Sequence, residues 1–140
     1  MEEHMDALFW PKDLLRSNCW TAHLEDLPIV GIIGRRRRAV RAQLAKRPKA
    51  LPISAWGNED RYTLASEISE VIRVQCNWPS PSFLPVDPCE IVLSDSCDGL
   101  QSVCALREIA RRFSIPEEDL KQATTQTFGS LIDYVLANKR

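Results

Sequence analysis

Apolar residues recur at intervals of three and four positions between residues 100 and 113. The repeating set is Leu100, Val103, Leu106, Ile109, Ala110 and Phe113. This spacing aligns the set along one side of a helix, so the pattern predicts an amphipathic α-helix. Asp98 is a suitable N-cap, because its carboxylate can accept backbone N–H groups of the first turn. Arg111 and Arg112 fall in the last turn, where cations suit the negative end of the helix dipole.

Two further segments show the same periodicity. The first begins at Asn58 and has the apolar residues Leu64, Ile68, Val71 and Ile72. The second follows Thr127 and has the apolar residues Phe128, Leu131, Ile132, Val135 and Leu136. Between them, serine and glutamate stand three apart in Ser114-Ile115-Pro116-Glu117, the spacing of a capping box, which predicts a short helix from Pro116 to Lys121. Three substantial helices and one short helix predict an all-α protein, an irregular four-helix bundle.

A long connection joins the first two of these helices. Residues 76–97 contain four prolines, at positions 79, 81, 85 and 88. The apolar run Ile91–Leu93 in this connection is compatible with a short strand, although no partner strand is evident. A connection of this length inside a compact domain is uncommon, and it calls for a structural reason.

The segment 98–113 resembles the second helix of an acyl carrier protein. That family has an Asp-Ser-Leu motif at the helix start, an aliphatic residue three positions after its Leu and a Phe thirteen positions after it. Leu100, Val103 and Phe113 fit this spacing. The match continues without a gap into residues 127–135, which are similar to the family's last helix and its Asp-Tyr-aliphatic ending.

The resemblance implies an acyl-carrier-protein-like bundle over the second part of the chain. In that bundle we expect the helix 100–113 to pack antiparallel against the helix 128–136. The family also has a long first loop that lies against the bundle. By resemblance, the apolar residues of the connection here should be buried, namely Trp78, Phe83, Leu84, Ile91, Val92 and Leu93.

The position that carries the family's chemistry is altered. The phosphopantetheine-bearing serine of the family falls on Gly99, between Asp98 and Leu100. Glycine has no side chain and cannot carry a phosphodiester. The resemblance therefore implies a non-catalytic interaction module that holds no cofactor. The alternative is a working acyl or peptidyl carrier, in which 4'-phosphopantetheine is attached to Ser96.

Carrier proteins present acidic residues along the second helix to basic partner surfaces. The corresponding residues here are Asp98, Gln101, Arg107, Glu108 and Arg111. We expect them to contact a protein partner. Because the second half of this surface has changed sign, the partners of ordinary carriers should bind it poorly.

The N-terminal part of the chain has a different pattern. Ile29, Ile33, Val40 and Leu44 lie four, seven and four positions apart, which predicts a helix over residues 28–47. Prolines at 48 and 52, followed by a Trp-Gly pair, mark residues 48–57 as a linker. We therefore divide the chain into an N-terminal extension with a basic helix, residues 1–50, and a carrier-like helical domain, residues 51–140.

Charge is unevenly distributed along this chain, whose net charge is −1. Residues 31–50 contain eight basic and no acidic side chains, whereas residues 51–140 contain thirteen acidic and eight basic ones. The predicted basic patch consists of Arg35, Arg36, Arg37, Arg38, Arg41, Lys46 and Arg47. Three interpretations of this patch stay open. It is a solvated helix face whose charge complements the acidic residues 51–140, a binding site for a polyanion or nucleic acid, or a site of attachment to an anionic membrane surface.

The composition and the motifs of the chain narrow the classes of protein to which it can belong. Five cysteines without a C-x-x-C pair predict neither a disulfide framework nor a structural zinc site. Neither a nucleophile elbow nor a glycine-rich phosphate loop occurs, so we predict no enzymatic activity, no metal and no small-molecule substrate. The start of the chain is acidic, and its apolar run Leu27–Ile33 is too short to span a bilayer, which favours a cytoplasmic protein with reduced thiols.

Overall fold

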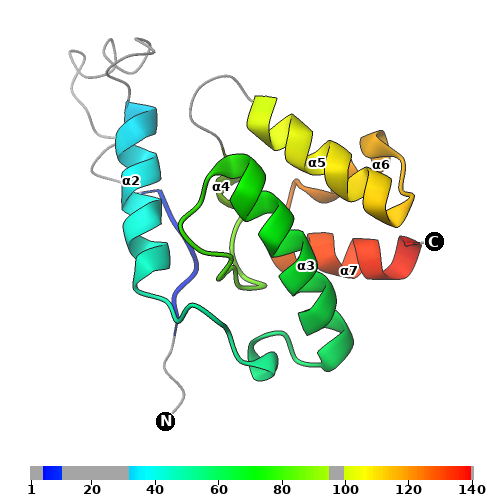
Figure 1. Ribbon diagram of the computed structural model, residues 1–140, viewed down its shortest axis with the longest axis horizontal. Helices are drawn as coiled ribbons and strands as arrows, with labels where there is room; N and C mark the ends of the chain where they lie inside the picture. The colour runs from blue at the N-terminus through cyan, green and yellow to red at the C-terminus, as the bar shows by residue number, and fades with distance from the viewer. Residues whose placement is uncertain (1–4, 11–31, 95–99, 140) are drawn as a thin grey trace.

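The computed structural model describes residues 5–10, 32–94 and 100–139, with the side chains of residues 32–35 excepted. In these ranges the regular structure is helical, and the only β-type pairing is an isolated bridge between Pro88 and Thr127. The helices are α2 (Ile32–Ala45), the 3-10 turn η2 (Ile53–Ala55), α3 (Glu59–Cys76), α4 (Cys89–Val92), α5 (Leu100–Phe113), α6 (Glu117–Ala123) and α7 (Phe128–Asn138) (Figure 1). The prediction of an all-α protein is confirmed for this part of the chain.

Local chemistry explains where the long helices begin and end. The side chain of Asn58 accepts a hydrogen bond from the backbone N–H of Arg61 and caps α3. The Thr127 hydroxyl accepts from the N–H of Ser130 and caps α7. At the other end of α3, Asn77 adopts a left-handed conformation with φ 59°, which lets Trp78 donate to the carbonyl of Arg73. The predicted helices over 58–75, 100–113 and 128–136 are confirmed.

Two local predictions are wrong. Ser114 does not open a capping box, because it has a positive φ of 54° and closes α5 instead. Its neighbour Ile115 is buried and donates to the carbonyl of Ala110, a helix-terminating arrangement. The segment Ile91–Leu93 is not a strand; it belongs to α4 and the residue that ends it, and the carbonyls of Pro88 and Cys89 accept its backbone N–H groups.

The long connection contributes buried residues, as expected from the resemblance. All six apolar residues named for it are buried: Trp78, Phe83, Leu84, Ile91, Val92 and Leu93. The indole N–H of Trp78 donates to the carbonyl of Val92 at 2.8 Å and so closes the loop on itself. Phe83 and Trp56 each pack edge-on against Phe128 at the start of α7, with ring centroids 5.7 and 5.5 Å apart.

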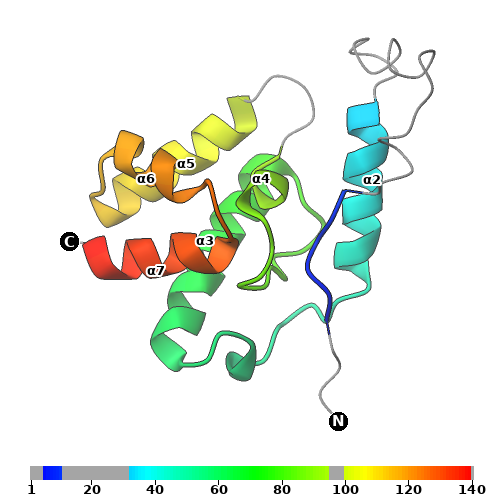
Figure 2. The same cartoon turned by 180° about the vertical axis from the view of Figure 1, so that it is seen from behind.

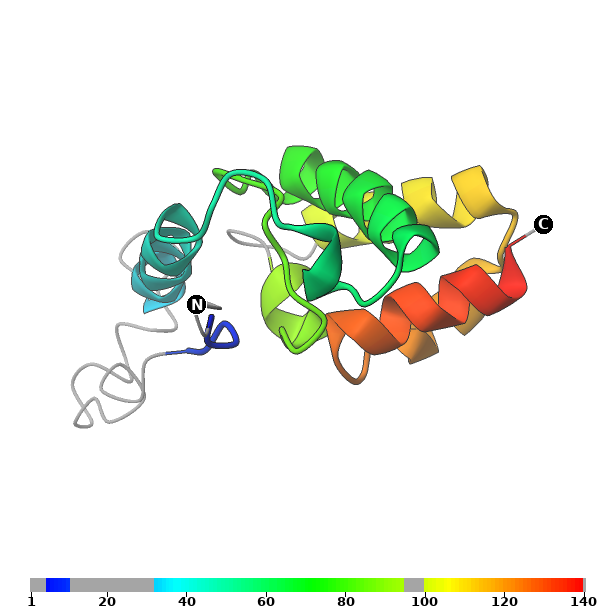
Figure 3. The ribbon, with the colours of Figure 1, turned by 90° about the horizontal axis from the view of Figure 1, so that it is seen from below.

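The helices α5 and α7 are not antiparallel, which corrects our expectation. Both pack on α3, and in Figures 1 and 3 they run in the same general direction. The reason lies in the return path of the chain through α6. The backbone of Gln126 and Phe128 is hydrogen-bonded to Cys89 and Asp87, and these bonds fix the start of α7 beside α4. From there α7 runs alongside α3 toward the same side as the end of α5.

The N-terminal elements join the same core. Leu8 of the extended segment 5–10 and Val40 and Leu44 of α2 are buried in one hydrophobic cluster with residues of α3, α5 and α7. Figure 2 shows α2 and the segment 5–10 side by side at the edge of the molecule next to α4. The segment 48–57, expected to be a linker, contributes buried Leu51 and Trp56.

Candidate interaction surfaces

The predicted attachment position lies outside the described residues. This holds for Gly99, for Asp98 and for the alternative attachment residue Ser96. The described structure resumes at Leu100, the first residue of α5. The described residues nearest to the attachment position are therefore those in the first turns of α5.

The first turn of α5 exposes apolar side chains to solvent. Leu100 is 60 % exposed and Val103 is 38 % exposed. The periodicity predicts both on the buried stripe, and for Leu100 and Val103 that prediction is wrong. The helix α5 packs on α3, and its buried residues lie in the later turns: Ala105, Leu106, Ile109, Ala110 and Phe113.

Two arginines extend this exposed apolar pair along the helix. Leu100, Val103, Arg107 and Arg111 are spaced three, four and four residues apart, which places them on one helical face. Arg107 and Arg111 are both exposed. We call these four residues the α5 strip. Gln101 lies beside the strip, and its side-chain oxygen is buried without a hydrogen-bond partner among the described residues.

The charges on the second half of α5 are matched within the chain. Glu108 accepts hydrogen bonds from Arg111 at 2.6 and 3.1 Å and from Arg112 at 2.9 Å. Hydrogen bonding from Arg111 and then Arg112 lowers the pKa of Glu108 to about 2. Arg107 lies 3.4 Å from the carboxylate of Glu117. The predicted partner-binding residues Glu108, Arg107 and Arg111 are therefore paired, whereas the apolar part of the strip stays largely open to solvent.

The predicted basic patch is divided between the interior and the surface. Arg37 is buried, donates to the carbonyls of Ser94 and Cys76 at 2.6 Å each, and stacks 4.2 Å from the centre of the Trp78 ring. This residue holds α2 against the end of α3. It is not part of an exposed patch, which corrects the prediction for Arg37.

Arg47 is also an internal residue. Its guanidinium forms a two-pronged ion pair with Asp87 at 2.7 and 2.8 Å, and the Asp87 side chain is completely buried. Arg47 further donates to the carbonyls of Ser82 and Asp6. The prediction of an exposed role is therefore wrong for Arg47 as well.

The other members of the basic segment are distributed along α2. Arg38, Arg41 and Lys46 are exposed, and Arg41 donates to the carbonyl of Asn77 at 3.2 Å. Arg36 is half-buried, and the side chain of Arg35 is outside the described part. Helical spacing alone does not single out the two internal arginines: Arg37 stands three residues before Val40, but the exposed Arg41 stands three before Leu44, and Arg47 lies beyond the end of α2.

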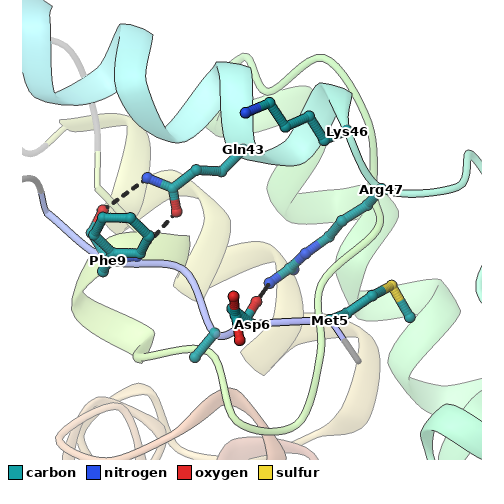
Figure 4. A pocket seen from close by; sticks show the side chains of 7 residues that line it. Met5, Asp6, Phe9, Gln43, Lys46 and Arg47 are labelled. Atoms are coloured by element: carbon teal, nitrogen blue, oxygen red, sulfur yellow. Dashed lines mark hydrogen bonds between the residues drawn. The ribbon is translucent and has the colours of Figure 1, made fainter. Parts of the chain in front are cut away.

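Polar side chains of other elements surround the N-terminal segment 5–10, an arrangement that the sequence did not predict. We call Gln43, Lys46, Arg47 and Asp87, which bond the segment or line the pocket beside it, the cradle. Gln43 of α2 exchanges two hydrogen bonds with the backbone of Phe9, at 3.1 Å to its N–H and 3.0 Å to its carbonyl (Figure 4). Asp87 accepts the backbone N–H of Leu8 at 2.9 Å. A surface pocket of about 490 Å³ opens here, lined by Met5, Asp6, Ala7, Phe9, Gln43, Lys46 and Arg47.

Three free cysteines lie among the described residues. Cys76, Cys89 and Cys104 are free, and burial raises the pKa of the Cys89 thiol to about 12, which keeps it neutral. Within residues 5–10, 32–94 and 100–139, no three His, Cys, Asp or Glu side chains gather as metal ligands. Nor does any helix in those ranges combine the length and the apolar character needed to cross a membrane.

Comparison of the chain with known protein families, with curated proteins and with solved structures finds no match.

Proposed function

We propose that residues 51–140 are an acyl-carrier-protein-like domain that has lost its prosthetic-group attachment and serves as a non-catalytic interaction module. The order of elements supports this proposal: a long helix, a long buried loop, a second long helix, a short helix and a last long helix. Burial of the loop residues, expected from the resemblance, also supports it. The shared direction of α5 and α7 differs from our expectation and lends the proposal no support.

The observation that carries the proposed role is the exposure of Leu100 and Val103 directly after Gly99. Burying a leucine or valine side chain fully is worth about 1.5–3 kcal/mol. The fold leaves much of this free energy unused at the start of α5. A protein partner with an apolar surface would recover it.

A modification assay tests the loss of the prosthetic group. The purified chain is incubated with a phosphopantetheinyl transferase and coenzyme A, and its intact mass is measured. We expect no mass gain for the natural chain. The Gly99→Ser variant restores the Asp-Ser-Leu motif, and we expect it to gain one phosphopantetheine unit.

The natural chain and the Gly99→Ser variant test different parts of the proposal. Modification of the natural chain would contradict the loss of the group, and its disappearance in Ser96→Ala would locate the group at Ser96 and establish the alternative of a working carrier. Absence of modification in a folded Gly99→Ser variant, with a genuine carrier modified in parallel, would contradict the carrier-like domain.

A capture experiment tests the interaction surface. The natural chain and Val103→Asp are immobilised and compared for proteins retained from the source cell extract. We expect specific partners to be lost with Val103→Asp and kept with the control Glu118→Lys, which changes an exposed residue of α6. If Val103→Asp and Glu118→Lys retain the same proteins, the result would contradict a role for the start of α5 in partner binding.

A further inference from the structure

The segment 5–10 is held mainly by its backbone. It forms no helix or strand, and four hydrogen bonds join its main chain to side chains of other elements. Gln43 bonds both the N–H and the carbonyl of Phe9, Asp87 accepts the N–H of Leu8, and Arg47 donates to the carbonyl of Asp6. Contacts of this type recognise an extended peptide without reading most of its side chains.

Leu8 is the most deeply buried apolar anchor of the segment, and the partly buried Trp10 also packs against the core. Leu8 is 2 % exposed and joins the core cluster beside Val40 and Leu44. Its neighbour Phe9 is 55 % exposed, although it is the larger apolar residue. The site therefore selects for a leucine-sized residue at one position and leaves the next residue at the surface.

The cradle is organised by contacts that do not involve the segment. Both oxygens of Asp87 are held by Arg47, and one of them also accepts the N–H of Leu84 at 2.7 Å. Arg47 in turn donates to the carbonyl of Ser82 at 2.9 Å. If the segment left, each buried charge would keep its partner, so the receptor groups are preorganised for a ligand.

The charges of segment and cradle are complementary. Residues 1–10 contain Glu2, Glu3 and Asp6 and no lysine or arginine. On its basic side the cradle is formed by α2 and the two residues that follow it, the exposed Lys46 and the buried Arg47, which both line the pocket beside the segment. Complementary charge of this kind favours an acidic ligand and speeds its association.

We propose that α2 and the loop 82–87 form a binding site for an extended acidic peptide with a leucine anchor. Residues 5–10 are the resident occupant, and a protein partner that presents the same chemistry displaces them. Access to the site is then controlled by competition within the chain. This site is separate from the α5 strip, so the two proposals stand or fall independently.

The test weakens the resident segment in the full chain and supplies the peptide separately. In Leu8→Asp the anchor is replaced by a charged side chain. A fluorescein-labelled synthetic peptide of residues 1–12 is titrated with the natural chain and with Leu8→Asp, and its fluorescence anisotropy is measured. We expect saturable binding to Leu8→Asp and at least tenfold weaker binding to the natural chain, because the resident segment competes there.

Two matched controls locate the binding. A labelled peptide that itself carries Leu8→Asp should bind the Leu8→Asp chain at least tenfold more weakly, because it lacks the anchor. Adding Gln43→Ala to the Leu8→Asp chain should weaken binding of the unmodified peptide about tenfold, because two hydrogen bonds to the peptide backbone are lost. Binding that neither substitution weakens would overturn the proposal. The absence of saturable binding to a folded Leu8→Asp chain would also overturn it.

A second chain covers the case in which Leu8→Asp does not fold. A protease cleavage sequence is placed between residues 11 and 31 of the otherwise natural chain, and the folded protein is cut. We expect the released N-terminal piece to exchange with the labelled peptide while the remainder keeps its circular dichroism spectrum. Unfolding on cleavage, or a piece that never exchanges, would overturn the proposal. Concentration-dependent dimers of the natural chain that disappear with Leu8→Asp would assign the site to a second copy and overturn a foreign partner.

Discussion

Gly129 lies where the second residue of α7 meets the long loop. A Cβ atom at this position would come within 2.9 Å of both the carbonyl oxygen and the Cβ of Pro85. The backbone N–H of Gly129 also donates to that carbonyl at 2.8 Å. The absence of a side chain is what lets α7 and the loop approach so closely.

We predict that Gly129→Ala destabilises the fold by about 1–3 kcal/mol, since the added methyl group forces the loop away from α7. Urea denaturation followed by circular dichroism measures the change in free energy of unfolding. Ser66→Ala, on the exposed side of α3, serves as a control and should change it by less than about 0.5 kcal/mol. Equal stability of Gly129→Ala and the natural chain would mean that the loop gives way freely.

A pH-dependent contribution comes from Glu108. Its pKa in the folded chain is lowered to about 2 by Arg111 and Arg112, below the value of about 4.3 for an unperturbed glutamate. A carboxyl whose pKa is lowered by folding stabilises the fold above its unfolded pKa, and that stabilisation is lost as the pH falls toward the folded pKa.

We therefore predict that Glu108→Gln lowers the melting temperature at pH 7 and that the difference from the natural chain closes between about pH 4 and pH 2. Thermal melts of both chains at pH 7, 4 and 2 measure it. A difference that stays constant over this range would show that the ion pairs with Arg111 and Arg112 do not cause it.

Ser114 shows the limit of sequence reading at single residues. The Ser-x-x-Glu spacing matches a capping box, and the helix that follows is correctly predicted. The serine itself is used to end α5 in a left-handed conformation. Two local patterns overlap in one stretch, and the choice between them depends on the burial of Ile115.

At the scale of elements, α2 turns one face inward and the other outward. Arg37, Val40 and Leu44 form the inward face, and Arg47, two residues beyond the end of the helix, also points inward. Arg38 and Arg41 point away from this core. Arg37 therefore contributes to the packing of the core, whereas the adjacent Arg38 contributes to the charge of the surface.

We predict that Arg37→Ala lowers the free energy of unfolding by about 2–3 kcal/mol, because the carbonyls of Ser94 and Cys76 lose a charged donor. The double variant Arg38→Ala with Arg41→Ala should keep most of its stability and elute from heparin at lower salt. Urea denaturation and a heparin column separate these effects. Weak heparin retention of the natural chain would rule out the polyanion interpretation of the basic segment.

The helix α5 is correctly predicted, but its burial is not. Its apolar stripe continues from Leu100 to Phe113 without a break in the sequence. Burial requires a neighbour, and the buried residues of α5 begin only at Ala105. Periodicity identifies the face that can be buried, whereas the position of the neighbouring elements decides how much of that face is buried.

At the scale of the whole molecule, Asp87 connects elements that are far apart in the sequence. Its carboxylate receives hydrogen bonds from Arg47, from the N–H of Leu84 and from the N–H of Leu8. Its own carbonyl accepts the N–H of Phe128 at 2.7 Å. One residue thus links α2, the long loop, the N-terminal segment and the start of α7.

We predict that Asp87→Asn destabilises the chain by about 3–5 kcal/mol, because it leaves the buried charge of Arg47 without a counter-charge. The matched control is Asp133→Asn, which alters another two-pronged arginine pair, with Arg61 at 2.8 and 3.2 Å, on the exposed surface. That change should cost less than about 1 kcal/mol. The two midpoints of urea denaturation give the comparison, and equal losses would contradict a special role for the buried pair.

The burial of the long loop was expected from the resemblance, whereas the sequence by itself determined the helical class and the positions of the long helices. These features depend on local spacing and capping, which each segment carries in its own residues. Tertiary structure alone decided which arginines of α2 are internal, which turns of α5 are exposed, the direction of α7 and the docking of residues 5–10. Each of these depends on contacts between residues distant along the chain, such as Arg47 with Asp87 and Gln43 with Phe9, and no local pattern encodes which distant group will come near.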